Sequence, residues 1–232
     1  AVISNSNGYA TDSYNVTYAP GLHGTGGATY TGGVTYDQDY TVLAPANIMN
    51  GEVAAPVVAN TGYTFTTWND GTADRATGYT YNPYQTAGDL TLTAQYRAHV
   101  ATITLDDKLY QDGAGQSIAG GRAATTASSP TPVYTRYDDH VYTDSTRETQ
   151  MTGNFTVPTL TGYTFGGFYT AQNGGGTQKI AADGTFTESA LTNLTATDNG
   201  SETLYAKWTA IGATLTYSCG VKPGAASGTL TP

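Results

Sequence analysis

The word TGYTF occurs twice in this 232-residue chain, at residues 61–65 and again at 161–165. A chance repeat is easy in a sequence rich in Thr, Gly and Tyr, so the surroundings of the two copies decide its meaning. Each copy is followed, three residues after its phenylalanine, by a second aromatic residue, Trp68 in one and Phe168 in the other. Agreement beyond the word itself indicates that one supersecondary unit is present twice.

The two copies also share how their blocks begin and end. The blocks close on similar strand patterns, DLTLTAQYRA (89–98) and SETLYAKWTA (201–210). They open on NVTYAPG (15–21) and ATITLDD (101–107), and a third opener, ATLTYSCG (213–220), follows the second closing strand. The sequence therefore predicts two complete modules and the start of a third.

The composition favours strands throughout. Charged residues make up 12% of the chain, about half the share near 25% that is typical of soluble domains. Branched and aromatic side chains, here Thr and 19 Tyr, pack well on a pleated surface, and the 29 Gly supply turns. We find no run of about ten residues with the apolar spacing of an amphipathic helix. The sequence therefore predicts an all-β chain.

The repeat divides the chain into four segments. We expect an N-terminal arm or linker over 1–13, a first module over 14–98, a second module with an enlarged first half over 99–210, and the first strand of an incomplete third module within 211–232. The expected strands are 14–19, 33–36, 40–43, 63–68 and 90–96 in the first module, and 100–105, 133–137, 139–142, 154–156, 163–169 and 203–208 in the second.

The repeated word is interpreted as a core-building element. A small module has little interior, so a few large rings must supply most of its buried apolar area. Gly62 and Gly162 are expected to form the turn into the strand, where φ is positive or a side chain would clash. The expected core residues are Tyr63, Phe65, Trp68 and Tyr96 in the first module and Tyr163, Phe165, Phe168, Leu204 and Trp208 in the second.

The pairing of GYTFGGFYT with TLYAKWT resembles the Listeria–Bacteroides repeat, the B-repeat of internalin-like surface proteins. GYTFTTWND with LTLTAQY is similar to the same signature, and the likeness covers roughly 15–98 and 99–210. The family's Gly-Gly turn is best kept at Gly26 and Gly27. The resemblance implies small twisted sheets related to the β-grasp fold, carried in tandem on bacterial surface or secreted proteins, with no catalytic residues. Ig-like β-sandwich modules are the alternative fold.

The charge balance disfavours several partners. The net charge is −9 and only nine basic residues are present, whereas nucleic-acid binding needs clustered Lys and Arg. The same balance disfavours an anionic membrane surface. No stretch of 18 apolar residues is present, so we expect no membrane insertion in this segment.

The sequence predicts no site that would bind a metal ion tightly. His23, His99 and His140 are isolated in turns and at the module junction, and neither His-x-His nor Cys-x-x-Cys occurs. Short acidic turns could bind Ca²⁺ weakly but lack the full set of oxygen ligands of a calcium loop; they are DQD (37–39), NDGTAD (69–74) and YDDH (137–140). The sequence therefore predicts no cofactor beyond weak Ca²⁺.

We expect no enzymatic activity. The chain has no G-x-S-x-G nucleophile turn, and the Gly-rich QNGGGTQ (172–178) lacks the lysine of a phosphate loop, so it is interpreted as a hairpin tip. Acidic residues fall in turns rather than in a pattern that would face two carboxylates across a cleft.

The strand pattern ATLTYS (213–218) is expected to lack partners within its own module. An uncovered apolar strand is an adhesive edge. Either the chain belongs to a longer repeat array, or the strand pairs with the N-terminal arm or with a sheet edge of a neighbouring copy. Head-to-tail pairing of that kind does not close and produces filaments. The single cysteine would then have its partner outside the chain. The residues expected to act in assembly are Val2, Ile3, Ala213, Leu215, Tyr217 and Cys219.

These expectations combine into a non-enzymatic bacterial cell-surface or extracellular protein. It would be a repeat stalk, adhesive segment or filament subunit, with itself, further repeats, or a host or cell-surface glycan or protein as partner. The alternative is a carbohydrate-binding surface module, because TGYTYNPYQ (77–85) places Tyr79, Tyr81 and Tyr84 in a short stretch. An assay against many glycans would separate the two.

Overall fold

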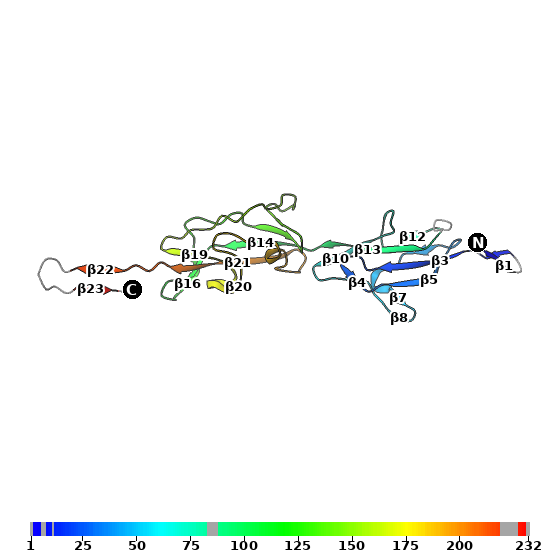
Figure 1. Cartoon of the computed structure of the whole chain (residues 1–232), viewed down its shortest axis with the longest axis horizontal. Coiled ribbons are helices and arrows are strands. Elements are labelled where there is room, and N and C mark those ends of the chain that lie inside the picture. Colours follow the sequence, from blue (N-terminus) through cyan, green and yellow to red (C-terminus); the bar gives the residue numbers. More distant parts are fainter. Residues whose placement is uncertain (1, 6–7, 11, 83–87, 219–226, 231–232) are drawn as a thin grey trace. The chain divides into compact units, whose positions relative to one another are not determined.

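The computed structural model describes residues 2–5, 8–10, 12–82, 88–218 and 227–230. The chain is all-β, with 51% of its residues in strands and 6% in helices, as the composition predicts. It divides into two compact units (Figure 1). The first comprises Ala1–Val100 with Ala196–Asp198, and the second comprises Ala101–Thr195 with Asn199–Pro232. Each is described on its own.

The first unit is built on a five-stranded mixed sheet. Its strands lie in the order β11 (Asp74–Arg75), β10 (Tyr63–Asn69), β13 (Leu90–Ala98), β3 (Ser13–Ala19) and β5 (Ala28–Thr35). The short paired strands beside it are β4 (Gly24–Thr25) with β9 (Val58–Ala59), β6 (Tyr40–Thr41) with β12 (Thr80–Tyr81), and β7 (Met49–Asn50) with β8 (Val53–Ala54). A 3₁₀ turn, η1, spans Pro45–Asn47.

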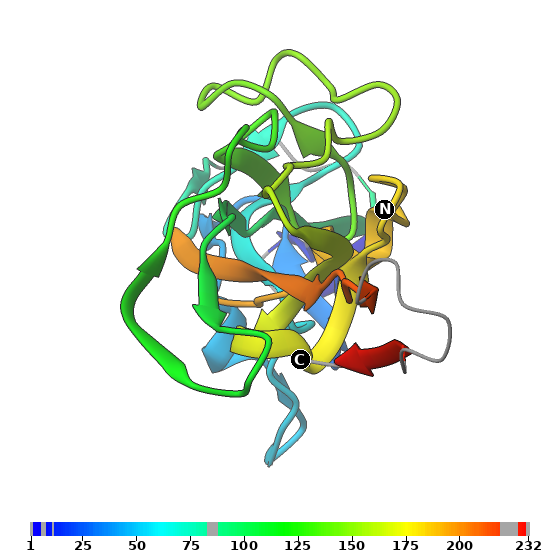
Figure 2. The same cartoon turned by 90° about the vertical axis from the view of Figure 1, so that its left-hand side faces the viewer.

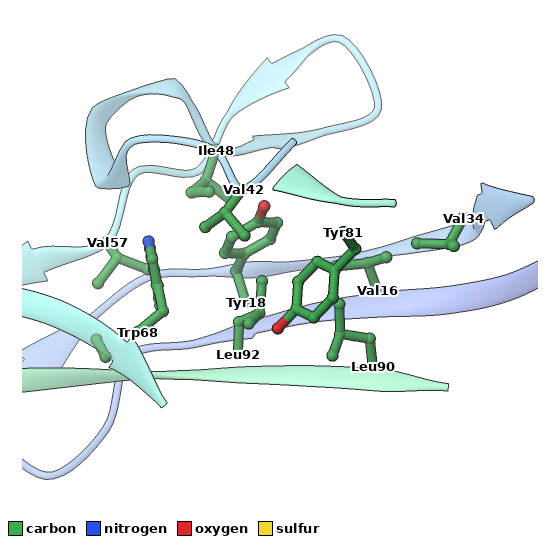
Figure 3. Close-up of a cluster of buried hydrophobic side chains, with 11 residues drawn as sticks. Val16, Tyr18, Val34, Val42, Ile48, Val57, Trp68, Tyr81, Leu90 and Leu92 are labelled. Atoms are coloured by element: carbon green, nitrogen blue, oxygen red, sulfur yellow. The ribbon is translucent and has the colours of Figure 1, made fainter. Parts of the chain in front are cut away.

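The alternation in LTLTAQY decides which face of this sheet is buried. Leu90, Leu92 and Ala94 alternate with exposed or half-buried residues, and Leu92 is fully buried. Figure 3 shows Leu90 and Leu92 beside Val16 and Tyr18 of β3. Val42 and Ile48, from the segment that follows β5, cover the same face of the sheet. The buried cluster consists of Val16, Tyr18, Val34, Val42, Ile48, Val57, Trp68, Tyr81, Leu90, Leu92 and Ala94.

The second unit is built on a six-stranded sheet. Its strands lie in the order β18 (Val141–Tyr142), β17 (Val133–Arg136), β14 (Val100–Asp106), β21 (Gly200–Ala210), β19 (Tyr163–Ala171) and β20 (Gly175–Ile180). The remaining elements are the hairpin of β15 (Leu109–Gln111) and β16 (Ser117–Arg122), the 3₁₀ turn η2 (Gln172–Gly174) and one short helix, α1 (Glu188–Thr192). Figure 2 shows the β15–β16 hairpin, in green, extending beside this sheet.

Apolar residues of the central strands form the interior of the second unit. Its buried cluster consists of Ile103, Leu105, Val133, Val141, Met151, Phe155, Phe168, Ile180, Leu191, Leu204 and Ala206. The helix α1 contributes Leu191, so this five-residue element is held by burial rather than by its length.

The strand that carries TGYTF occupies the same place in both sheets. In each unit it pairs antiparallel with the closing strand, which in turn pairs parallel with the opening strand. The registers agree: Phe65 lies opposite Tyr96, and Phe165 lies opposite Trp208. A β-bulge follows each of these phenylalanines. The two units therefore use one pairing scheme around the repeated word.

The expectation that ATLTYS has no partner in the chain is wrong. β22 (Leu215–Ser218) pairs antiparallel with β23 (Ser227–Leu230), so its backbone groups are matched along one side. The N-terminal arm likewise pairs with itself, as β1 (Val2–Asn5) with β2 (Gly8–Ala10). Local hairpins of this kind compete with strand pairing to another chain.

Three local expectations also differ from the structure. Residues 154–156 form no strand, because Thr156 makes only an isolated bridge to Ser129. The Gly-rich 172–178 is more than a hairpin tip, since β20 begins at Gly175. β5 begins at Ala28, before the expected start at residue 33, because it pairs with β3 along most of its length.

Candidate functional site

The repeated word builds an aromatic triplet in each unit. In the first unit the triplet is Phe65, Trp68 and Tyr96, with Phe65 at 5.0 Å from Trp68 and 6.2 Å from Tyr96 between ring centroids. Trp68 is fully buried, and its indole N–H donates to the Leu43 carbonyl at 3.0 Å. Phe65 and Tyr96 are half-buried against the core. Tyr63 lies outside the buried cluster, and its ring stacks on the His23 ring with 3.9 Å between the ring centroids.

The second unit repeats the triplet with Phe165, Phe168 and Trp208. Phe165 lies 5.1 Å from Phe168 and 5.4 Å from Trp208 between ring centroids. Phe168 and Leu204 are fully buried, whereas Phe165 and Trp208 are half-buried against them. Tyr163 again lies outside the buried cluster, with the guanidinium of Arg122 5.9 Å from its ring centroid.

The closing strand of each unit makes one further contact that the sequence does not reveal. The Tyr96 hydroxyl donates to the Pro20 carbonyl at 2.7 Å, and the Trp208 indole N–H donates to the Asp107 carbonyl at 2.9 Å. Pro20 and Asp107 are each the first residue after the opening strand. We call this pair of contacts the aromatic latch. The acceptor is main chain, which any residue supplies, so no sequence signal marks it.

Gly62 and Gly162 both have positive φ, +81° and +85°. Each stands immediately before its strand, in a turn closed by a hydrogen bond from Tyr63 N to Asn60 O and from Tyr163 N to Leu160 O. A Cβ at Gly162 would meet nothing within 4 Å, so the backbone angle, and not crowding, is what requires glycine there.

The residues expected to act in assembly lie at the two ends of the chain. Val2 and Ile3 are in β1, and Leu215 and Tyr217 are in β22. Ala213 is exposed, just before that strand. Cys219 lies outside the described residues. Four members of this set thus lie in two hairpins, β1–β2 and β22–β23.

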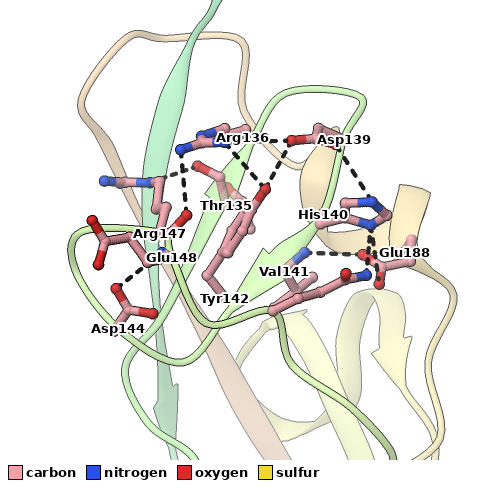
Figure 4. A network of polar contacts seen from close by, with 11 residues as sticks. Thr135, Arg136, Asp139, His140, Val141, Tyr142, Asp144, Arg147, Glu148 and Glu188 are labelled. Atoms are coloured by element: carbon pink, nitrogen blue, oxygen red, sulfur yellow. Dashed lines mark hydrogen bonds and ion pairs between the residues drawn. The ribbon is translucent and has the colours of Figure 1, made fainter.

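The three histidines have separate surroundings. His99 bonds Thr64 through Nε2 at 2.7 Å and the Ala196 carbonyl through Nδ1 at 2.6 Å. The His140 ring lies between two carboxylates, as Figure 4 shows. Its Nε2 is 3.6 Å from Asp139 Oδ1, and its Nδ1 is 3.8 Å from Glu188 Oε1. Among the residues that the structure describes, no group of three or more His, Cys, Asp or Glu side chains could hold a metal ion.

The acidic turn NDGTAD is closed by its own hydrogen bonds. Asp70 Oδ1 accepts from the backbone and hydroxyl of Thr72, and Oδ2 accepts from Arg75 at 2.7 Å and from the Tyr81 hydroxyl at 2.9 Å. Partial burial alone would raise the pKa of Asp70, but these donors hold it well below its usual range. Both oxygens are thus engaged by protein groups.

The same turn engages two of the tyrosines proposed for carbohydrate binding. Tyr81 is 7% exposed, and the Arg75 guanidinium lies 4.6 Å from the ring centroid of Tyr79 and 5.6 Å from that of Tyr81. Sugar-binding rings need an open face, and these two are occupied by core and cation contacts. Tyr84 lies outside the described residues.

A polar network ties the enlarged first half of the second unit together (Figure 4). The Arg147 guanidinium donates to the main-chain carbonyls of Ala101, Thr135 and Ser145 at 3.0–3.1 Å. Asp144 closes the adjacent turn by accepting from Thr146 and from backbone N–H groups, which lowers its pKa.

Asp107 is a half-buried carboxyl group of the second unit. It borders a cavity of about 500 Å³ that is lined, among others, by Asp106, Lys108 and Ala123. Its Oδ2 accepts from Ser128 N at 2.8 Å, whereas Oδ1 and the Ser128 hydroxyl are buried without a hydrogen-bond partner among the described residues. Burial raises the pKa of Asp107, with the Ser128 contacts acting in the opposite direction.

Comparisons with known proteins identify no relative. No family model matches the sequence, and no curated protein or solved structure matches it. Within the described residues, no helix has both the length and the apolar character needed to cross a membrane. The resemblance to the Listeria–Bacteroides repeat therefore rests on the motifs quoted above.

Proposed function

We propose that this chain is a non-enzymatic structural segment of a bacterial cell-surface or extracellular protein, a stalk built from tandem modules of the Listeria–Bacteroides type. The observation that carries the proposal is the common pairing scheme of the two units. Phe65 opposite Tyr96 and Phe165 opposite Trp208, each followed by a bulge, repeat one arrangement a hundred residues apart. Tandem copies of one fold unit are a common way to build a spacer.

The use of the side chains supports a structural role. The phenylalanines of the repeated word, Phe65 and Phe165, pack against the interior, and the carboxylates of Asp70 and Asp144 close turns. The half-buried Asp107 accepts a hydrogen bond from the backbone N–H of Ser128. These residues stabilise loops and sheets, as a spacer module requires.

As partners we propose further modules of the same kind and, at the distal end, a host or cell-surface protein or glycan. The carbohydrate-binding alternative is less favoured, because Tyr79 and Tyr81 pack on Arg75 instead of presenting open rings. The low share of charged residues also supports an extracellular location. The folding stability of such a chain depends little on the salt concentration outside the cell.

Labelling of intact cells tests this proposal. Antibodies raised against the 232-residue chain should label unbroken cells of the source organism or its culture medium, and brief treatment with external protease should remove the cell-bound signal. A cytoplasmic enzyme from the same cells serves as the lysis control. A signal that appears only after lysis would contradict the proposed location.

A further inference from the structure

The opening and closing strands of each unit are direct neighbours that run in the same direction. In the first unit β3 and β13 pair in parallel, with Val16 opposite Leu90 and Ala19 opposite Thr93. In the second, β14 and β21 pair in parallel from Ala101 opposite Gly200 onward, through six residue pairs. The strand by which the chain enters a unit is therefore bonded to the strand by which it leaves.

This arrangement decides how tension acts on a unit. Because the two strands are parallel, the entry point at Ser13 and the exit point at Ala98 lie at opposite ends of the pair. Tension applied through the chain pulls the strands past each other along their length, and the hydrogen bonds between them are loaded together. In an antiparallel hairpin both chain ends lie at one end, so its bonds open one after another.

The aromatic latch extends this pair beyond the ladder. β3 ends at Ala19, yet the Tyr96 hydroxyl bonds the next carbonyl, that of Pro20, at 2.7 Å. The Trp208 indole makes the corresponding bond beyond β14, to the Asp107 carbonyl at 2.9 Å. Both contacts join the last aromatic residue of the closing strand to the opening segment, so they resist the same sliding motion.

The parallel pairs are also shielded from water on one face. Val16, Tyr18 and Leu92 are at most 1% exposed in the first unit, and Ile103 and Leu204 are fully buried in the second. Water that cannot reach a strained hydrogen bond cannot replace it, and a bond broken without replacement costs more.

We propose that both units are tension-bearing modules in which the parallel pairs β3·β13 and β14·β21, each extended by its aromatic latch, set the resistance to stretching. The chain passes from β13 to β14 through His99 alone, so a pull along the chain reaches both pairs. The inference rests on the proposed stalk and gives it a mechanical task. Its test is made on the isolated chain, so it can fail or succeed independently of where the protein is located.

Single-molecule stretching of the full chain by tags at its two ends tests the proposal. We expect two unfolding events, with length gains of about 30 nm for the first unit and about 35 nm for the second, given about 0.36 nm per extended residue. Pulling direction is the decisive variable. A Thr17→Cys, Thr91→Cys chain, also carrying Cys219→Ser, allows the first unit to be pulled across the β3·β13 pair, since Thr17 and Thr91 lie directly opposite each other in the ladder.

Under equal force, the first unit should unfold much faster when pulled between positions 17 and 91, which separates the two strands sideways, than when the same variant is pulled by its terminal tags. Equal unfolding rates in the two directions would overturn the proposal, because a unit held by its core alone has no reason to distinguish them. The terminal pull of the variant also shows that it is folded.

The aromatic latch is tested with Tyr96→Phe, which keeps the ring and removes the donor to Pro20. We expect the first unit to unfold about fivefold faster under a fixed terminal force, the effect of one lost hydrogen bond. The second unit in the same molecule is the internal control and should not change. Tyr79→Phe, a tyrosine outside β3 and β13, is the matched control. An unchanged rate for Tyr96→Phe would remove the latch from the proposal.

Discussion

At the scale of single residues, the aromatic side chains of the two triplets include two with a core task and two with an added hydrogen bond. Trp68 and Phe168 fill the interior, whereas Tyr96 and Trp208 also bond main-chain carbonyls that lie 76 and 101 residues away in sequence. The first task follows from residue type and spacing. The second could not be predicted, because a carbonyl acceptor carries no side-chain signal and its position depends on the completed sheet.

Removal of the Trp68 ring should destabilise the first unit strongly. Trp68 is fully buried, and its N–H bond to Leu43 would be lost with the ring. We expect Trp68→Ala to lower the free energy of unfolding by about 3–5 kcal/mol, measured by circular dichroism in denaturant. Leu22→Ala, at a side chain that is 85% exposed, should change it by less than about 0.5 kcal/mol. Similar effects at the two positions would contradict the described core.

Asp107→Asn should leave the protein at least as stable as the original chain around pH 7. Burial raises the pKa of Asp107 in the folded state, so the ionised carboxylate costs stability above that pKa. The cost disappears as pH falls below the unfolded value, near 3.9. The amide oxygen of the substituted side chain can still accept from Ser128 N. The denaturation midpoints of the two chains should therefore converge toward about pH 3; a variant less stable at every pH would refute this.

At the scale of the elements, some strands could be predicted from the sequence and others could not. The alternation of Leu90, Leu92 and Ala94 indicated β13 and its buried face, because period-two patterning reports burial directly. β20 was missed because its Gly-rich start has low strand propensity, and pairing with β19 overrides that propensity. The expected strand 154–156 failed for the opposite reason, since its apolar Phe155 faces the core from a loop.

The turn into the TGYTF strand offers a clean test of backbone conformation. Gly162 has φ of +85° with open space around it, whereas Gly212 has equally open space without a positive φ. Gly162→Ala should therefore lower the stability of the second unit by about 1–2 kcal/mol, the cost of a side chain in the left-handed region. Gly212→Ala should leave it unchanged. Thermal unfolding of both variants measures the difference, and equal midpoints would exclude the backbone explanation.

At the scale of the whole molecule, the repeat was visible in the sequence and its pairing scheme was not. Parallel pairing of opening and closing strands needs no local turn, so only the folded chain reveals it. For the strand β22, the sequence led to a wrong expectation about its partner. ATLTYS was expected to lack a partner because the third module was interpreted as a first strand alone, yet β23 supplies one.

The pairing of β22 with β23 bears on assembly. Because the terminal strand has a partner in its own chain, we expect the full chain and a version that ends at Ala210 both to sediment as monomers. Electron microscopy of the same samples should show no filaments. Filaments from the full chain but not from the shortened one would instead assign head-to-tail assembly to the segment after Ala210.

The aromatic triplets also provide the protein with its own optical reporters. The chain has two tryptophans, and the triplets place one in each unit, Trp68 fully buried and Trp208 half-buried. Their fluorescence should differ in colour, since a dry indole emits at shorter wavelength than a partly hydrated one. Tyr18, with its ring 4.9 Å from Trp68, can pass excitation energy to that indole. Melting of each half can thus be followed by emission spectrum alone, without any attached dye.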